Sequence, residues 1–158
     1  MQIKKVLNKR EVEEIEKIIE KNYGCRIGME NYIVFMTGEE KIWITSNDVD
    51  FNIFNFLKRC YRIGIYFGKL KRNRKIKLSI EGAMMVGKKA IKNIAILNDE
   101  EALKYIHGYD VKADRIIEGD LNNFVLIKNR EDFIGVGILR ENYIENLIPK
   151  SRRIVKGN

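Results

Sequence analysis

The pattern that most constrains the fold is a pair of short segments, residues 65–70 and 75–80, separated by a polar turn at residues 71–74. In the second segment, large aliphatic residues alternate with lysine and serine. Because successive side chains of a strand point to opposite faces, this alternation predicts a half-buried strand whose outer face is basic. The two segments are therefore expected to pair across the turn as two strands.

The residues before this strand pair predict a helix followed by a hairpin. Asn8 and Glu11 have the spacing of a capping box, in which each side chain satisfies a backbone donor at the start of a helix. Apolar residues then recur at helical spacing until Gly24, where the helix should end. Residues 31–36 and 41–45 have the composition of two antiparallel strands joined by a short turn.

Two further helices are expected in the first half. One follows the polar caps at residues 46–48, and its apolar side is made by Phe51, Phe54, Leu57 and Tyr61. A short helix over residues 81–86 follows the basic strand pair. Together these elements predict an N-terminal α/β domain with antiparallel strands over residues 1–89.

From about residue 90 the pattern changes to short strands at close spacing. Residues 92–97 predict a strand, and Asp99 is expected to cap a helix that runs to about Ile106. Further extended pieces follow at residues 111–117, 123–128 and 133–139. Short strands at regular spacing are typical of a small barrel. The sequence therefore predicts an α+β fold, with a small barrel domain over residues 90–158 packed on the first domain.

The distribution of charge is the main pointer to function. The chain has a formal net charge of +8 and a pI near 9.4, which suits a polyanionic partner. Most of the excess lies between Lys58 and Lys92, where Glu81 is the only acidic residue. Strand alternation should place the lysines of each arm on one face of that arm. The cations of the strand pair that we assign to phosphate binding are Lys69, Lys71, Arg72, Arg74, Lys75 and Lys77.

Two interpretations of these cations compete. Lysines along a solvated strand edge discourage sheets from pairing with one another, but that role needs only one or two charges. A phosphate-binding surface uses many charges, and the aromatic residues Tyr61, Tyr66 and Phe67 could stack on unpaired bases if they are exposed. We favour phosphate binding because the number of cations exceeds what protection of an edge requires.

A second, smaller cluster of cations lies in the C-terminal tail. It follows the single proline, Pro149, and two interpretations of it stay open. The tail is either a frayed, solvated end or the last strand of the barrel, which would deliver cations beside the loop at Gly108. The cluster consists of Lys150, Arg152, Arg153 and Lys156.

Motifs for catalysis are weak. Residues 82–88 match the spacing of a phosphate loop, but Lys89 follows where a serine or threonine must bind magnesium, and the intervening residues favour a helix. His107 is the only histidine, which removes most acid–base and metal-binding designs. Gly135 and Gly137 lie within a predicted strand, where glycine more often permits close backbone approach. We therefore expect no enzyme activity, no cofactor and no metal site.

Cellular location is suggested by the cysteines and by the N-terminus. Cys25 and Cys60 are isolated, without metal-ligand spacing, which favours buried thiols in a reducing compartment. The first residues are not followed by the apolar core of a signal peptide, and no stretch approaches the ~20 apolar residues of a membrane span. We expect a cytoplasmic protein with no membrane partner.

Two parts of the chain resemble a family of large-subunit ribosome assembly factors that carry a PUA domain and occur in archaea and eukaryotes. Residues 61–70 followed by 74–80 resemble its signature of a glycine, an aromatic-or-small pair, Gly-Lys, a basic turn and an alternating strand. Residues 105–111 are similar to its aromatic-x-x-Gly-x-x-Val entry into the C-terminal domain. Residues 133–138 are similar to its penultimate strand, which carries Gly-x-Gly.

This resemblance implies an N-terminal α/β domain packed on a C-terminal PUA-like pseudo-barrel that binds RNA. In PUA domains, RNA usually lies along the helix after the first strand, the glycine loop that follows it, and the final strand. The residues at those positions here are Lys104, His107, Gly108, Tyr109, Lys112, Arg152 and Arg153.

The expected function is binding of rRNA during assembly of the large ribosomal subunit, together with protein partners of pre-ribosomal particles. The alternative that stays open is a tRNA-binding accessory subunit or module of an RNA-modification enzyme. Either function requires an RNA-binding surface and no catalytic residue in this chain.

Overall fold

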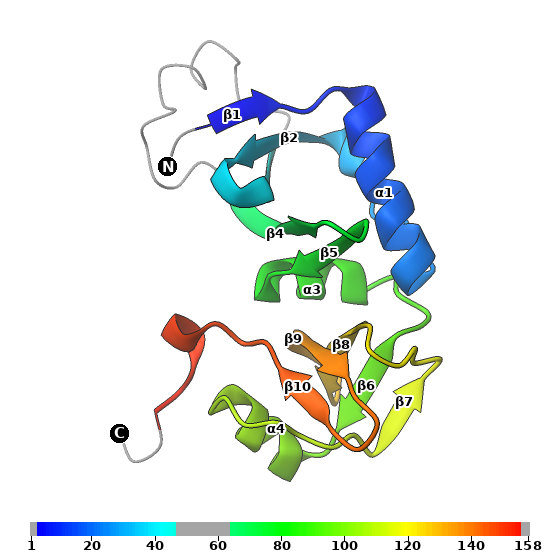
Figure 1. Cartoon of the computed structure of the whole chain (residues 1–158), viewed down its shortest axis with the longest axis vertical. Helices are drawn as coiled ribbons and strands as arrows, with labels where there is room; N and C mark the ends of the chain where they lie inside the picture. Colours follow the sequence, from blue (N-terminus) through cyan, green and yellow to red (C-terminus); the bar gives the residue numbers. More distant parts are fainter. Residues whose placement is uncertain (1–2, 47–63, 156–158) are drawn as a thin grey trace.

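The computed structural model describes residues 3–46 and 64–155 (Figure 1). Within these ranges the chain forms two five-stranded sheets with short helices around them, so the fold is of the mixed α and β kind. The second predicted helix, at residues 51–61, lies outside the described residues, as do Cys60 and Lys156.

The first sheet is antiparallel throughout, with the strand order β1-β2-β3-β4-β5. Its strands are β1 (Ile3–Val6), β2 (Tyr32–Thr37), β3 (Lys41–Ser46), β4 (Ile65–Lys71) and β5 (Lys75–Leu78). The two strand pairs expected from the sequence are confirmed as β2–β3 and β4–β5. Strand β1 was not predicted, because its residues do not alternate between polar and apolar.

Helix α1 (Lys9–Tyr23) begins and ends where the sequence predicts. The Asn8 side chain accepts a hydrogen bond from the Glu11 backbone at 2.9 Å, and the Glu11 carboxylate accepts one from the Asn8 backbone at 3.2 Å. Gly24 ends the helix in the left-handed conformation, with φ of 74°. The apolar stripe, which includes Ile15 and Ile19, is buried and anchors the helix against the first sheet.

Helix α3 (Ile80–Gly87) lies between the two sheets in Figure 1 and contacts both β4 and the second sheet. It begins one residue earlier than the helix predicted over residues 81–86. The basic strand β5 is correspondingly shorter than predicted and ends at Leu78 rather than at Ile80. The cause is Ser79, whose hydroxyl accepts a hydrogen bond from the backbone N–H of Gly82 at 2.9 Å and caps the helix.

The second sheet has the order β10-β9-β8-β6-β7, with β6 and β8 parallel and the other pairs antiparallel. Its strands are β6 (Ile94–Leu97), β7 (Arg115–Ile117), β8 (Phe124–Asn129), β9 (Asp132–Leu139) and β10 (Ile144–Asn146). An isolated bridge joins Val111 to Ile144 of β10. Val111 precedes β7 at one edge of the sheet, and β10 is the strand at the opposite edge. The bridge between them therefore curls the sheet toward a barrel.

Helix α4 (Asp99–Ile106) crosses one end of this sheet and corrects one expectation. The N-cap is Asn98, not Asp99, and its side chain accepts a hydrogen bond from the Glu101 backbone at 2.8 Å. Asp99 instead lies in the first turn and binds the guanidinium of Arg130 at 2.6 Å. Arg130 lowers the pKa of Asp99, chiefly through this hydrogen bond.

The two sheets share part of one hydrophobic core. The cluster beneath the first sheet includes Ile94, Leu126 and Val136, which belong to the second sheet. A separate cluster around Tyr105 and Val125 fills the interior of the curled second sheet. Because buried side chains from both sheets are packed together, we expect the two sheets to hold a fixed relative orientation.

A buried polar cluster joins α1 to the second sheet. Asn93 is fully buried with φ of 56°, and its amide donates to the carbonyl of Asn22 at 2.6 Å and to the carboxylate of Asp120 at 3.2 Å. Its side-chain oxygen accepts from the Asp120 backbone at 2.9 Å. Asn123 adds a hydrogen bond to the Asn22 side chain at 2.6 Å.

This cluster predicts a stability effect. Asn93→Ala should lower the free energy of unfolding by about 2 kcal/mol, because the buried Asn93 side chain loses its hydrogen bonds to Asn22 and Asp120. Urea denaturation measures it, with Asn122→Ala as the matched control, since Asn122 has a similar φ of 62° but is exposed. Equal destabilisation by the two substitutions would show that only the positive φ matters and would contradict this account.

Candidate nucleic-acid interface

Four lysines form a single face of the β4–β5 hairpin. Lys69 lies directly opposite Lys77, and Lys71 lies directly opposite Lys75. Residues directly opposite in an antiparallel pair point to the same side, so all four side chains share one face. Lys41 of β3 lies opposite Lys69 and extends the row. We call Lys69, Lys71, Lys75 and Lys77 the lysine face; the buried Ile76 and Leu78 are on the other side of β5.

The charge of the lysine face is poorly balanced. Lys69 lies 3.9 Å from the carboxylate of the exposed Glu39, and Lys75 donates a hydrogen bond to the side chain of Asn123. Lys71 and Lys77 form no ion pair with any residue that the structure describes. Burial lowers the pKa of Lys77, and the charges of Lys71 and Lys69 lower it further. An anion at this face would relieve that repulsion.

The turn of the hairpin contributes two arginines. Arg72 is exposed at the tip, beside Lys71. Arg74 adopts a positive φ of 58°, and its guanidinium reaches the carboxylate of Glu14 on α1 at 3.1 Å. Arg72 is thus available to a ligand, whereas Arg74 would have to exchange one exposed ion pair for another, at little energetic cost.

The aromatic residues of β4 do not behave as regular alternation predicts. Tyr66 lies opposite Trp43, and Gly68 lies opposite Ile42. Phe67, between them in β4, therefore has no partner in β3, and the pair of strands has a β-bulge at this point. Phe67 is fully buried, which rules out stacking on a base. Tyr66 instead joins the side of the sheet that carries Lys69, half-buried, with its ring centroid 5.2 Å from that of Trp43. Tyr61 lies outside the described residues.

A cleft of about 390 Å³ opens beside the lysine face. One wall carries Tyr66, Lys69 and Lys77, and the opposite wall is the C-terminal segment around Ile148 and Arg152. Figure 1 shows this segment leaving β10, passing below α3 and turning toward α4. The structure therefore brings together hairpin and tail cations that the sequence analysis treated as two separate clusters.

Arg152 is held at the cleft by an ion pair. It lies in the short helix η3 (Lys150–Arg152), and its guanidinium is 3.0 Å from the carboxylate of Glu81 at the start of α3. Both side chains are partly exposed, so the pair adds little stability in solution. Its main consequence is to place the Arg152 side chain at the mouth of the cleft.

Residues 150–155 form neither a frayed end nor a barrel strand. The backbone N–H of Ile154 donates to the carbonyl of Ile106 at 2.9 Å, and the carbonyl of Ile154 contacts Nδ1 of His107. After η3 the described tail has no strand pairing, but it lies beside the Gly108 loop. The second interpretation is confirmed only in that the tail brings one cation, Arg153, beside this loop.

The backbone conformation and the packing of Gly108 both favour glycine. Its φ of +96° favours glycine, and a Cβ there would lie 2.6 Å from the Arg153 side chain. The space over the glycine is thus filled by Arg153, whose Nε also donates to the carbonyl of Ile148 at 3.4 Å. In this conformation an RNA backbone would contact Arg153 rather than the glycine itself.

The remaining predicted PUA residues surround the end of α4. Lys104 is exposed and pairs with Glu101 at 3.2 Å, and the same Glu101 accepts a hydrogen bond from the Lys112 backbone at 2.9 Å. That backbone hydrogen bond is the largest cause of the lowered pKa of Glu101. Tyr109 is exposed, with its carbonyl held by the Asn146 side chain at 2.7 Å. These residues form a second exposed surface, joined to the cleft through η3.

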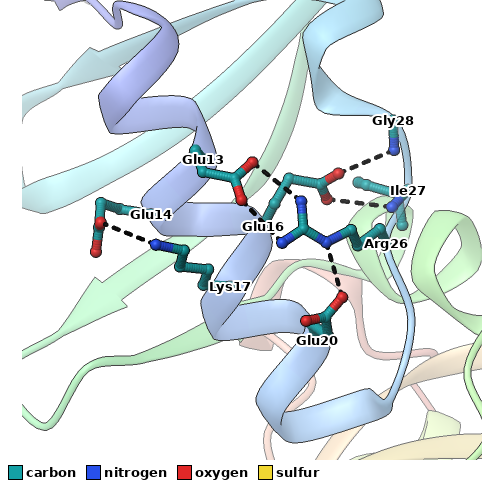
Figure 2. A network of polar contacts seen from close by, with 8 residues as sticks. All are labelled: Glu13, Glu14, Glu16, Lys17, Glu20, Arg26, Ile27 and Gly28. Carbon is teal, nitrogen blue, oxygen red and sulfur yellow. Dashed lines mark hydrogen bonds and ion pairs between the residues drawn. The ribbon is translucent and has the colours of Figure 1, made fainter.

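Helix α1 carries a contrasting, acidic surface that the sequence analysis did not single out. The guanidinium of Arg26 binds Glu13 at 2.8 Å and Glu20 at 2.7 Å (Figure 2). The buried carboxylate of Glu16 accepts from the backbone N–H groups of Ile27 and Gly28, both at 3.1 Å. The hydrogen bond from Arg26 lowers the pKa of Glu13. The three carboxylates outnumber the single guanidinium on this surface, which makes it a poor site for a polyanion.

The phosphate-loop match is a helix in the structure. Residues 82–87 lie in α3, and the two glycines are explained by packing. A Cβ on Gly82 would lie 2.2 Å from the carbonyl oxygen of Phe67, and one on Gly87 would lie 2.4 Å from the Phe133 ring. Among residues 3–46 and 64–155 there is also no group of three metal-ligating side chains. No helix among them is long and apolar enough to cross a membrane.

Comparison with known proteins identifies the fold. The chain is similar to the crystal structure of a PUA domain from Aeropyrum pernix K1 in complex with tartrate, with a TM-score of 0.57 and 12% sequence identity. The match covers 91% of this chain and 84% of that chain. This likeness shows a PUA-like fold. No family model and no curated protein matches the sequence.

Proposed function

We propose that the protein binds RNA and has no catalytic centre of its own. The observation that carries this proposal is the lysine face, in which four lysines point the same way and only Lys69 forms an ion pair within the described residues. Concentrated like charge is unfavourable in a folded protein unless an anion neutralises it. RNA supplies phosphates at regular spacing, and counterion release makes such contacts a main source of affinity.

We propose further that the RNA is rRNA and that the protein acts in assembly of the large ribosomal subunit, where it contacts other proteins. Three observations support this finer proposal: the likeness of residues 58–140 to an assembly-factor family, the PUA-like fold, and two basic surfaces joined through η3. In this account the first domain, residues 1–89, supplies phosphate contacts, and the second domain, residues 90–158, supplies selectivity for RNA shape. The free and buried Cys25 suits a reducing cytoplasm.

Direct competition tests the identity of the RNA. A labelled fragment of large-subunit rRNA, bound to the full chain, is displaced by unlabelled rRNA fragments or by tRNA at about 0.15 M salt. Displacement by rRNA at lower concentration than by tRNA supports the assembly role. Preference for tRNA overturns it and favours the accessory subunit of an RNA-modification enzyme.

A further inference from the structure

We propose that the cleft between the lysine face and the C-terminal segment holds one unpaired nucleotide of the bound RNA, with its base against Tyr66 and its phosphate between Lys77 and Arg152. This inference rests on the proposed function, because it assigns a specific ligand to one part of the RNA-binding surface. It goes beyond general phosphate attraction, since it predicts that the protein distinguishes a bulged or single-stranded nucleotide from a paired one.

The size of the cleft suits one nucleotide. At about 390 Å³ it falls near the lower end of the range for small-molecule sites, about 300 to 1,000 Å³. A double helix is too wide to enter such a space, whereas an unstacked base can turn into it. Unpaired bases in loops and bulges are also the features that proteins use to recognise RNA.

The walls of the cleft include apolar and aromatic side chains. Leu147 and Pro149 contribute apolar surface, and Tyr66 contributes a ring. The Tyr66 ring contacts its cross-strand neighbour Trp43, at 5.2 Å between centroids and 45° between planes. A ring that packs against a neighbour is already restricted, so stacking a base on it costs less conformational entropy.

The cations lie on the two sides of the same opening. Lys69 and Lys77 come from directly opposite positions of β4 and β5, and Arg152 faces them from the tail. Lys77 has no ion-pair partner among the residues described, and burial together with its lysine neighbours lowers its pKa. A phosphate there would stabilise the charged form of Lys77. Glu81 holds Arg152 in place and is already neutralised by it.

Two other hollows of the described surface fit this role less well. The groove along α1, about 570 Å³, is lined by Glu13, Glu16 and Glu30 as well as by two cations, so it would repel a phosphate. The groove between α3 and β9 has a ring, Phe133, but Lys128 already lies over it, 5.3 Å from the centroid, and two carboxylates balance the two lysines of the lining. Of these three hollows, only the cleft beside the lysine face has more cations than carboxylates in its lining.

Paired RNA probes test the proposal. One probe is an RNA hairpin with a single bulged nucleotide, and the other is the same hairpin fully paired. The full-length protein should bind the bulged hairpin more tightly, and Tyr66→Ala should reduce its affinity for that RNA by about tenfold. Tyr66→Phe keeps the ring and should keep the preference. Lys77→Ala should reduce the preference for the bulged over the paired hairpin. Lys71→Ala removes one lysine outside the cleft and serves as the control; it should weaken the binding of both hairpins equally.

Amide chemical shifts locate the nucleotide independently of affinity. Titration with the bulged hairpin should move the resonances of Gly64, Ser79 and Ile80, which line the cleft. Equal binding of the two hairpins, or shifts confined to the hairpin tip and the Gly108 loop, overturns the inference while leaving RNA binding intact. Failure to bind either hairpin overturns the proposed function as well. If Tyr66→Ala does not fold, the comparison of Lys77→Ala with Lys71→Ala decides.

Discussion

Replacing Lys69, Lys71, Lys75 and Lys77 together by glutamate is expected to weaken RNA binding about a thousandfold. We take each lysine–phosphate contact as about 1 kcal/mol, the upper end for exposed ion pairs, so four lost contacts correspond to about three decades of affinity. Fluorescence anisotropy at about 0.1 M salt measures the loss. Directly opposite lysines become directly opposite glutamates, so repulsion across the hairpin is similar. The Lys69–Glu39 ion pair that is lost is solvent-exposed and contributes little, so the fold should be retained.

A control with the same net charge makes this result specific. Each lysine-to-glutamate exchange removes two units of charge, so the four together take the formal net charge from +8 to zero. A second variant reverses four exposed cations elsewhere, Lys4, Lys9, Arg10 and Lys21. This control should lose far less affinity than the hairpin variant. Equal loss in the two variants would show that only net charge matters and would contradict a binding face on the hairpin.

The largest expected effect on stability comes from Gly135→Ala. Gly135 lies in β9 with φ of +154°, and a Cβ there would lie 2.2 Å from the hydroxyl oxygen of Tyr105. Tyr105 is fully buried, and its hydroxyl donates to the carbonyl of Val136 at 2.7 Å, so the ring cannot move without losing that hydrogen bond. Overpacking of a core usually costs about 1–3 kcal/mol, and the backbone strain adds to it, so a loss of about 3 kcal/mol is expected.

Urea denaturation measures this loss, with Gly38→Ala as the control. Gly38 has no atom within 4 Å of an added Cβ, so its substitution should change the free energy of unfolding little. A Gly135→Ala protein as stable as Gly38→Ala would show that Tyr105 does not fix α4 against β9. Since α4 carries the Gly108 loop, the same variant should also loosen the surface formed by Tyr109 and Arg153.

Local sequence patterns predicted the helix caps and strand pairs, because these depend on neighbouring residues. The capping box at Asn8 and Glu11 and the alternation around Ile76 are examples. Alternation also showed that Lys75 and Lys77 share a face. The orientation of Phe67 could not be predicted in this way. It depends on the bulge opposite β3, and a bulge is a property of the pairing rather than of either strand.

Local sequence patterns also could not predict that the residues of the candidate site come together in space, for a similar reason. Lys77 and Arg152 are far apart in sequence, and they line one cleft only because α3 packs between the sheets and binds Arg152 through Glu81. The role of Asn93 was missed because its partners, Asn22 and Asp120, come from distant segments. Contacts of this kind depend on tertiary packing, for which no periodicity in the sequence gives a signal.

The measurement that tests the central claim most directly is the salt dependence of RNA affinity for the unmodified protein. Anisotropy titrations with a single-stranded RNA across a salt series give the slope of log affinity against log salt concentration. Four phosphate contacts at the lysine face predict a slope of about −3 or steeper, since each contact contributes about −0.7 on single strands. Absence of measurable binding at low salt would contradict the account and would leave the lysine face as a solvated surface.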